Sequence, residues 1–571
     1  MSKNIFGNAR FGTFLAVGLV VLGLILSSCG EGEIKEQKSA EGLLPEEFLP
    51  KDAGIFAGYS VMNDDQFAAL QNLKTKADFA GDISKSISDR VDSSLSGLGL
   101  SYETDLKPAL GGKFRLVYTE KPKEAINGEV AEESISEKFA VVTLMDPAKM
   151  QTILIAMVDG GRIMKQNVSG MDVYKGEDGV NYMAIHKDLL LIASDPESLI
   201  AMTKLEKGES LWDSETYQDF MEKGADESIF YGAVDPSSYT GGLSAGLSGI
   251  ATSGVAGVIK YEGVLVKAEE SGFKFDFFVV ADEEKAKETD VVFDSIPKIK
   301  SYLLSEVPNQ GLVIYVESYG LKQSMEDLEK SAAEEDEESS FAGIEEYART
   351  YFGMDLKEDI LAFLDKGYVF AFHKNGEEII PGITIYADVS SAPDKARTFL
   401  DKLDGQITGL MITLEQALPG AVSKGTVDVN GEILNMVRVD MSKIPNTDGS
   451  PLPAVVTTSS LEIVYGILGD RLLITTAPIW QGDAVEKVSD GSLYKSLDQH
   501  VSNGEGLVLF DSGNAGEFFA ALRALREQLQ LEISEPMLAA EDVLKVFEGF
   551  IGRSETSKYE VHSSGYLLMA E

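Results

Sequence analysis

The sequence predicts an α+β fold made of two homologous tandem units, each with an antiparallel or mixed sheet and packed helices. Short apolar or alternating runs, such as Ile55 to Val61 and Leu189 to Ala193, indicate strands. Between them, stretches such as Met150 to Val158 repeat apolar residues three and four positions apart, which is the spacing of a helix face. Glycine turns such as Asn430-Gly431 are hairpin signals, and adjacent hairpins favour an antiparallel or mixed sheet.

An internal repeat supports the division into two units. Gly99 to Tyr118 aligns without a gap on Gly353 to Phe372, which pairs Asp105 with Asp359 and Leu110 with Leu364. Further blocks match in the same order, which makes duplication the most economical explanation. They are LPKDAGIFAGYS from Leu49 with VPNQGLVIYVES from Val307, Ala140 onward with Ile383 onward, YMAIHKDLLLIAS from Tyr182 with VYGILGDRLLITT from Val464, Tyr217 onward with Tyr494 onward, and SGFKF at Ser271 with SGYLL at Ser564.

The repeat and the composition predict the domain boundaries. We expect a signal peptide at 1–28, a tether at 29–43, the first unit at 44–281 and the second at 301–571. The charged, apolar-poor stretch EEKAKETD, from Glu283 to Asp290, predicts a linker at 282–300. Leu110 and Leu364 precede an apolar strand in each unit, so both are expected to face a core.

The stretch from Phe11 to Cys29 reads as an export signal. A head carrying Lys3 and Arg10 precedes an apolar run that ends in Leu26, Ser27, Ser28 and Cys29. This ending resembles the bacterial lipobox, and the resemblance implies a diacylglyceryl group on Cys29. The alternative is an uncleaved anchor, for which the apolar run falls short of the ~20 residues that span a bilayer. The sequence therefore predicts a protein of the cell envelope, lipid-anchored to a bacterial membrane on its periplasmic or extracellular face.

Composition excludes one class of partner. Cys29 is the only cysteine among 571 residues, so an exported chain would be held by core burial without disulfides. The formal net charge of −43 argues against nucleic acid as a partner, because binding it needs a basic face. The acidic cluster from Glu334 to Glu338 lacks the ligand spacing of a calcium loop and indicates a solvated surface.

Candidate chemistry is sparse, and no catalytic, cofactor or metal residue is predicted. Ser244 lies in GLSAG, which matches a nucleophile elbow, but a run of Gly, Ser and Ala residues surrounds it. The four histidines, His186, His373, His500 and His562, show no metal-ligand spacing. Aspartates recur after predicted strands and favour helix capping over an acidic cleft. They are Asp146, Asp195 and Asp235, each followed by proline, with Asp388 and Asp511 at the corresponding places.

The segments LPKDAGIFAGY, GLSYETDLKPALGGKFRLVY and KDLLLIASDPESL resemble an uncharacterised bacterial family of exported and lipoprotein chains that carries a domain of unknown function. The resemblance brings no catalytic residue to this chain. We therefore expect a membrane-anchored envelope lipoprotein with a binding or structural role and an envelope protein as a possible partner. An envelope hydrolase, using a serine or a metal, is the alternative.

We predict that the mature protein begins at Cys29 and carries lipid there, because LSSC follows the apolar run. Mass spectrometry of the N-terminal peptide from native membranes measures this directly. An intact Met1 or an unmodified Cys29 would show that the lipobox interpretation is wrong.

Overall fold

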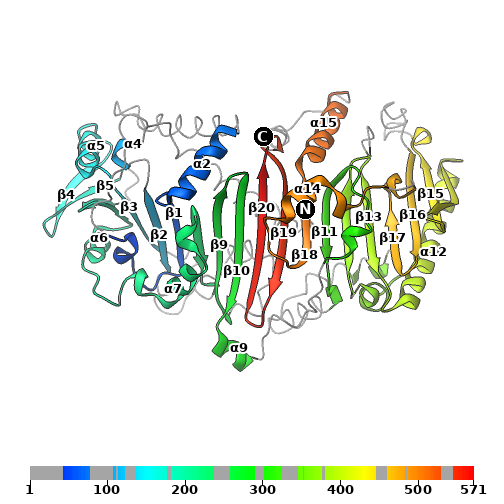
Figure 1. The fold of residues 1–571 in the computed structure, drawn as a ribbon, viewed down its shortest axis with the longest axis horizontal. Helices are drawn as coiled ribbons and strands as arrows, with labels where there is room; N and C mark the ends of the chain where they lie inside the picture. Colours follow the sequence, from blue (N-terminus) through cyan, green and yellow to red (C-terminus); the bar gives the residue numbers. More distant parts are fainter. Residues whose placement is uncertain are drawn as a thin grey trace. The chain divides into compact units, whose positions relative to one another are not determined.

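The chain divides into two compact units that lie within residues 1–291 and 292–570. The computed structural model describes residues 43–76, 107–110, 114–122, 136–176, 182–236, 257–289, 301–322, 345–346, 348–350, 353–364, 366–375, 380–444, 460–481, 485–528 and 544–570. Figure 1 labels the helices and strands of both units.

The described part of unit 1 holds an antiparallel sheet in the order β4-β5-β6-β7-β3-β2-β1-β8-β9-β10. The strands are β1 (Ile55–Ser60), β2 (Arg115–Pro122), β3 (Ser136–Thr143), β4 (Met164–Val168), β5 (Met171–Lys175), β6 (Tyr182–His186), β7 (Leu189–Ala193), β8 (Phe230–Val234), β9 (Ile259–Glu269) and β10 (Gly272–Ala281). Its helices are η1 (Pro45–Phe48), α2 (Asp64–Lys76), α4 (Lys107–Leu110), α5 (Pro147–Asp159), α6 (Pro196–Met202), η4 (Leu211–Asp213), α7 (Glu215–Glu222), η5 (Ala225–Glu227) and α9 (Glu283–Thr289).

Unit 2 has a sheet of the same order, β14-β15-β16-β17-β13-β12-β11-β18-β19-β20, and it is also antiparallel in its described part. The strands are β11 (Leu312–Ser318), β12 (Tyr368–His373), β13 (Gly382–Asp388), β14 (Val422–Val429), β15 (Glu432–Asp440), β16 (Ser460–Leu468), β17 (Arg471–Thr475), β18 (Glu505–Asp511), β19 (Phe547–Thr556) and β20 (Glu560–Met569). Its helices are η7 (Leu303–Ser305), η8 (Leu356–Ile360), η9 (Leu361–Phe363), α12 (Pro393–Ala417), η10 (Met441–Lys443), η11 (Pro478–Gln481), η12 (Val488–Asp490), α14 (Ser492–Asp498) and α15 (Ser512–Gln528).

Hairpin turns recur at matching places in the two sheets. Ser169-Gly170 joins β4 to β5, and Asn430-Gly431 joins β14 to β15. All four residues have positive φ, between 52° and 89°, as a type I′ turn requires. The predicted hairpin at Asn430-Gly431 is therefore confirmed.

The core of unit 1 packs aromatic rings over β1. Gly58 faces Tyr231 of β8, and the Tyr231 ring lies where a side chain on Gly58 would be, with Cζ only 2.0 Å from the position of a Cβ. Phe56 and Phe220 pack edge to face beside this ring, with centroids 5.5 Å apart. Glycine at position 58 is thus a condition of the aromatic packing.

Unit 2 distributes its large side chains differently on the corresponding rungs. Here the tyrosine is on the central strand, since Tyr315 of β11 faces Leu509 of β18. On the next core-facing rung, Glu317 pairs with Val369 of β12, whereas unit 1 pairs Ser60 with Arg115. The two cores therefore share a strand order but not a packing pattern.

The structure agrees with most predicted elements and corrects three details. Leu110 and Leu364 are half-buried, and the preceding residues Ala109 and Phe363 occupy the core instead. The charged stretch after β10 forms the helix α9, with Ala286 buried, rather than an irregular linker. The match of Ser271 with Ser564 is wrong in register. Ser271 lies in the β9–β10 turn, but Ser564 pairs with Arg553 in the middle of the β19–β20 ladder.

We predict that Gly58→Ala destabilises unit 1 by about 1–3 kcal/mol or more, because the new methyl group overlaps the Tyr231 ring. Hydrogen exchange of the full chain, compared between peptides of the two units, measures the effect. Gly232→Ala on β8 is the matched control, since a Cβ there meets its neighbours at an ordinary 3.4 Å. Equal exchange in both variants would contradict the packing argument.

His373 is a fully buried histidine at the end of β12. Its Nδ1 lies 3.3 Å from the main-chain oxygen of Gln310, and its Nε2 has no hydrogen-bond partner. Burial lowers the pKa of His373 from 6.5 to about 4, so the side chain is neutral in the folded protein near neutral pH.

This pKa shift predicts how the stability of unit 2 changes with pH. Because the folded-state pKa lies below 6.5, protonation favours the unfolded chain. The contribution of His373 is therefore complete above pH 6.5 and is lost as the pH falls towards 4, amounting to about 3 kcal/mol. Urea unfolding of unit 2 across this range should show a smaller pH slope in His373→Gln than in wild type. His562→Gln is the control, and an unchanged slope in His373→Gln would refute the assignment.

Candidate functional site

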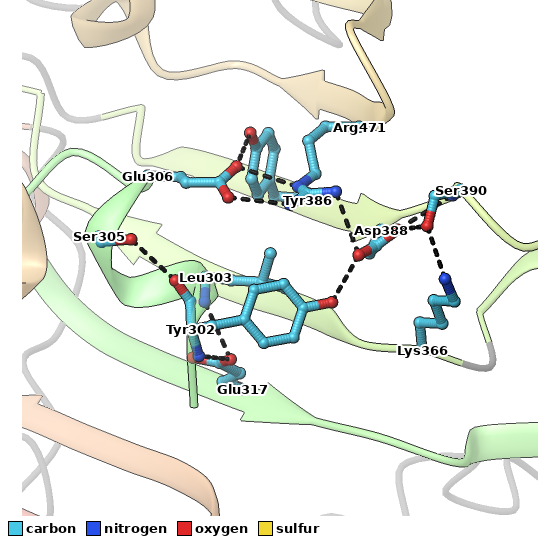
Figure 2. A network of polar contacts seen from close by, with 10 residues as sticks. All are labelled: Tyr302, Leu303, Ser305, Glu306, Glu317, Lys366, Tyr386, Asp388, Ser390 and Arg471. Carbon is cyan, nitrogen blue, oxygen red and sulfur yellow. Dashed lines mark hydrogen bonds and ion pairs between the residues drawn. The ribbon is translucent and has the colours of Figure 1, made fainter. Parts of the chain in front are cut away.

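Arg471 is the centre of a polar network in unit 2 (Figure 2). Its guanidinium donates two hydrogen bonds of 3.0 Å to Glu306 and lies 3.1 Å from Asp388 Oδ2 on β13. Tyr386 donates to Glu306 at 2.7 Å, and Tyr302 donates to Asp388 at 2.6 Å. Burial opposes the charge on Asp388, but hydrogen bonds from Ser390 and Tyr302 together with Arg471 outweigh it and lower the pKa of this carboxyl group.

Glu317, also drawn in Figure 2, extends the polar contacts into the core, where it is 1% exposed. The main-chain N–H groups of Tyr302 and Leu303 donate to its Oε1 at 2.9 and 3.1 Å. The hydroxyls of Tyr315 and Tyr319 donate to its two carboxylate oxygens, at 2.6 and 2.5 Å. Four donors thus compensate the burial of one carboxylate and fix η7 against β11.

Unit 1 solves the same problem with different residues. Glu46 of η1 is fully buried and forms an ion pair with Arg115 of β2. The hydroxyls of Tyr217 and Tyr231 donate to Glu46 Oε1 at 2.8 and 3.0 Å. Burial raises the pKa of Tyr231 to about 12, so this hydroxyl stays protonated and remains a donor.

These networks have the chemistry of structural clasps. Their carboxylates accept from arginine, tyrosine or main-chain donors, and the tyrosines are held protonated. A buried pair of this kind orients segments of the chain, and removing one partner leaves an uncompensated charge. The networks therefore position η1 and η7, and a ligand site must be sought elsewhere.

An opening between β5 and β6 of unit 1 provides such a site. The two strands pair only at Lys175 with Tyr182 and at Tyr174 with Met183, whereas β6 pairs with β7 along its whole length. Beyond the Tyr174–Met183 rung the β4–β5 hairpin leaves the sheet, and Figure 1 shows it extending outward from the rest of unit 1. We call the resulting space the wedge.

The wedge opens into a cavity of about 540 Å³, within the range of small-molecule sites. Its walls come from both separated strands, the β4–β5 turn and the helices α5 and α6. The lining residues are Gln151, Ser169, Gly170, Met171, Asp172, Ile185, His186, Ile200, Thr203 and Lys204. Apolar and polar side chains alternate around it, so the cavity can hold an amphipathic ligand.

The charges around the wedge leave one cation without a counter-ion. Asp172 forms an ion pair with Lys165, their charged atoms 2.6 Å apart, so its charge is compensated. Lys204, exposed at the mouth, forms no ion pair with any residue of the described ranges. Burial and the neighbouring Lys187 lower the pKa of His186, which leaves a neutral imidazole with one donor and one acceptor. The cavity is thus locally cationic in a strongly acidic chain.

A second cavity of about 590 Å³ lies in unit 2, beside the start of α15. Asp511 and Glu517 contribute carboxylates to its lining, and Leu493, Leu544 and Phe547 contribute apolar side chains. Glu517 is paired with Lys374, and Asp511 accepts from the Asn514 amide, so its acidic groups already have partners. The wedge is therefore the stronger candidate site.

The structure accounts for only part of the sequence-predicted residues. Cys29, Ser244 and the acidic cluster from Glu334 to Glu338 lie outside the described residues. Of the histidines, only His186 lines either cavity, and it was predicted to have no function. His500 stacks on Tyr566 with ring centroids 3.8 Å apart, and His562 lies on β20. Within the described ranges, no cluster of three or more His, Cys, Asp or Glu side chains could hold a metal ion.

The predicted capping aspartates are correct with one exception. Asp146 and Asp195 accept hydrogen bonds from the main-chain N–H groups of Lys149 and Ser198, in the first turns of α5 and α6. Asp511 caps α15 through Asn514 in the same way. Asp388 differs, because it belongs to the Arg471 network and precedes no helix directly. Sequence reasoning missed Arg471, Glu306, Glu46 and Arg115, whose partners are far apart in the chain.

Comparisons with known proteins place the chain in a family without supplying a function. No curated protein matches it. Two solved structures of a protein named TP0453, crystal forms IV and III, are 9% and 8% identical to it. They cover 42% and 48% of this chain and 81% and 90% of their own, with TM-scores of 0.24 and 0.25, too low to carry an argument. No helix among the described residues is long and apolar enough to span a membrane. A family model described as "Protein of unknown function (DUF3352)" matches residues 12–416, so the chain belongs to the DUF3352 family.

Proposed function

We propose that this protein is a lipid-anchored envelope lipoprotein that binds a ligand or partner through the wedge of unit 1. The proposed anchor rests on the lipobox ending at Cys29. The proposed binding role rests on one observation, the cavity that opens where β5 and β6 stop pairing. Buried networks elsewhere in the described chain use their polar groups internally, whereas the wedge presents polar groups to a space.

We further propose that the two units arose by duplication. Three observations support it, namely the shared strand order, the matching type I′ turns and a ladder break on the same rung. In unit 2, β15 and β16 stop pairing at Asn435 with Tyr465, which corresponds to Tyr174 with Met183. There the side chain of Leu434 leans over Gly466, 2.7 Å from where a Cβ would lie. Unit 1 would then be the copy in which this opening became a binding site.

The binding role predicts that filling the wedge abolishes a specific contact in the native envelope. Thr203 lines the cavity at the end of α6, and Thr203→Phe places a ring in it. Crosslinking in intact cells, followed by recovery of the full-length protein, should show at least one partner or ligand adduct. We expect its yield to fall about tenfold in Thr203→Phe, as a loss of about 1.4 kcal/mol in binding would produce.

Thr152→Phe on α5 is the matched control, because Thr152 is exposed and lies outside the cavity lining. Adducts that survive Thr203→Phe at wild-type yield would refute a binding role for the wedge. N-terminal mass spectrometry of the same samples reports separately on the anchor.

A further inference from the structure

The broken ladder leaves particular main-chain groups facing the wedge. In a two-residue hairpin the residues flanking the turn bond each other, and the direction of the main-chain groups then alternates along each strand. Val168 pairs with Met171 across the Ser169-Gly170 turn, so the N–H and C=O of Asp172 point away from β4, towards β6.

The same counting applies to β6. His186 pairs with Leu189 across the turn at Lys187 and Asp188, so the main-chain groups of Ile185 point away from β7, towards β5. In a continuous ladder Ile185 and Asp172 would bond each other two residues beyond the Tyr174–Met183 rung. That rung is absent, and both residues line the cavity instead.

An absent rung of this kind selects a ligand that carries amide groups. Main-chain N–H and C=O groups that leave water must find partners, and an unmade bond costs about 1–3 kcal/mol. A peptide unit offers one donor and one acceptor at the spacing of a strand, which is how extended peptides add to an open sheet edge. Ile185 presents exactly one donor and one acceptor on such an edge.

The side chains of the cavity specify the charge of the ligand. Lys204 lacks a counter-ion among the described residues, whereas Asp172 is already paired with Lys165. An acidic group on the ligand would face Lys204 at the mouth, while Met171 and Ile200 offer apolar walls for an adjacent side chain. A basic ligand gains nothing comparable here.

We propose that the wedge of unit 1 binds a short extended peptide, whose main chain pairs with Ile185 and whose acidic side chain or carboxylate lies beside Lys204. This inference rests on the proposed binding role of the wedge and names its ligand class. The unpaired main-chain groups would provide affinity for any extended peptide, and Lys204 would select the acidic one.

Photo-crosslinking of the full-length protein in detergent micelles tests the proposal. The probe is a capped tripeptide with a central glutamate and a neighbouring diazirine side chain. Matched probes carry glutamine or lysine at the centre, and a further probe has N-methylated main-chain amides. Mass spectrometry of the digested protein locates the labelled residues.

The glutamate probe should label the β5–β6 region and α6 at least tenfold more than the lysine probe, with the glutamine probe between them. N-methylation should reduce labelling to background, because it removes the main-chain donors. Lys204→Glu should reverse the order of the glutamate and lysine probes, whereas Lys207→Glu, which makes the same charge change outside the cavity lining, should leave the order unchanged.

Equal labelling by the N-methylated and unmodified probes would overturn main-chain pairing, and an unchanged order in Lys204→Glu would overturn the role of the lysine. If no probe labels the wedge but Thr203→Phe still removes the native adduct, the peptide assignment is wrong and the binding role stands. If neither effect occurs, both proposals fail.

Discussion

The burial of carboxylates inside each unit is the constraint on which the rest of the fold depends. An unpaired charge in a core costs several kcal/mol, so Glu46 and Glu317 must be met by donors from other segments. Glu46 holds η1 against β2, α7 and β8, and Glu317 holds the turn of η7 against β11. The aromatic packing of Phe56, Phe220 and Tyr231 then follows, because the Tyr231 hydroxyl is fixed at Glu46 and its ring must cross Gly58.

Sequence patterns foretold the fold wherever the information was local. The Asn430-Gly431 turn, the capping aspartates before α5 and α6, and the apolar runs of β7 and β8 each reflect backbone preferences of a few adjacent residues. Local patterns failed where packing decided the outcome. Ala109 rather than Leu110 reached the core, and Ser271 and Ser564 shared letters without sharing a place in the hairpin.

The candidate site was beyond the reach of such patterns. Glu46 and Arg115 are joined only through the tertiary fold, and nothing in the spacing of the residues around them signals an ion pair. The wedge depends on where a ladder ends, which is set by the outward path of the β4–β5 hairpin and leaves no mark in composition. His186 could be noted from the sequence, but its neighbours in the cavity, from Gln151 to Lys204, come from four other elements and turns.

The Gly58–Tyr231 contact also bears on the fidelity of folding. A chain whose two sheets have the same strand order offers every strand a second place in which it could pair, and strand exchange between such units is a known route to misassembly. If β11 took the place of β1, Tyr315 would arrive on the rung of Gly58, where the Tyr231 ring already lies. Glu317 would arrive opposite Arg115 but without the main-chain donors of Tyr302 and Leu303. A single missing side chain thus discriminates between two otherwise interchangeable strands, and it directs each half of the polypeptide to its own sheet.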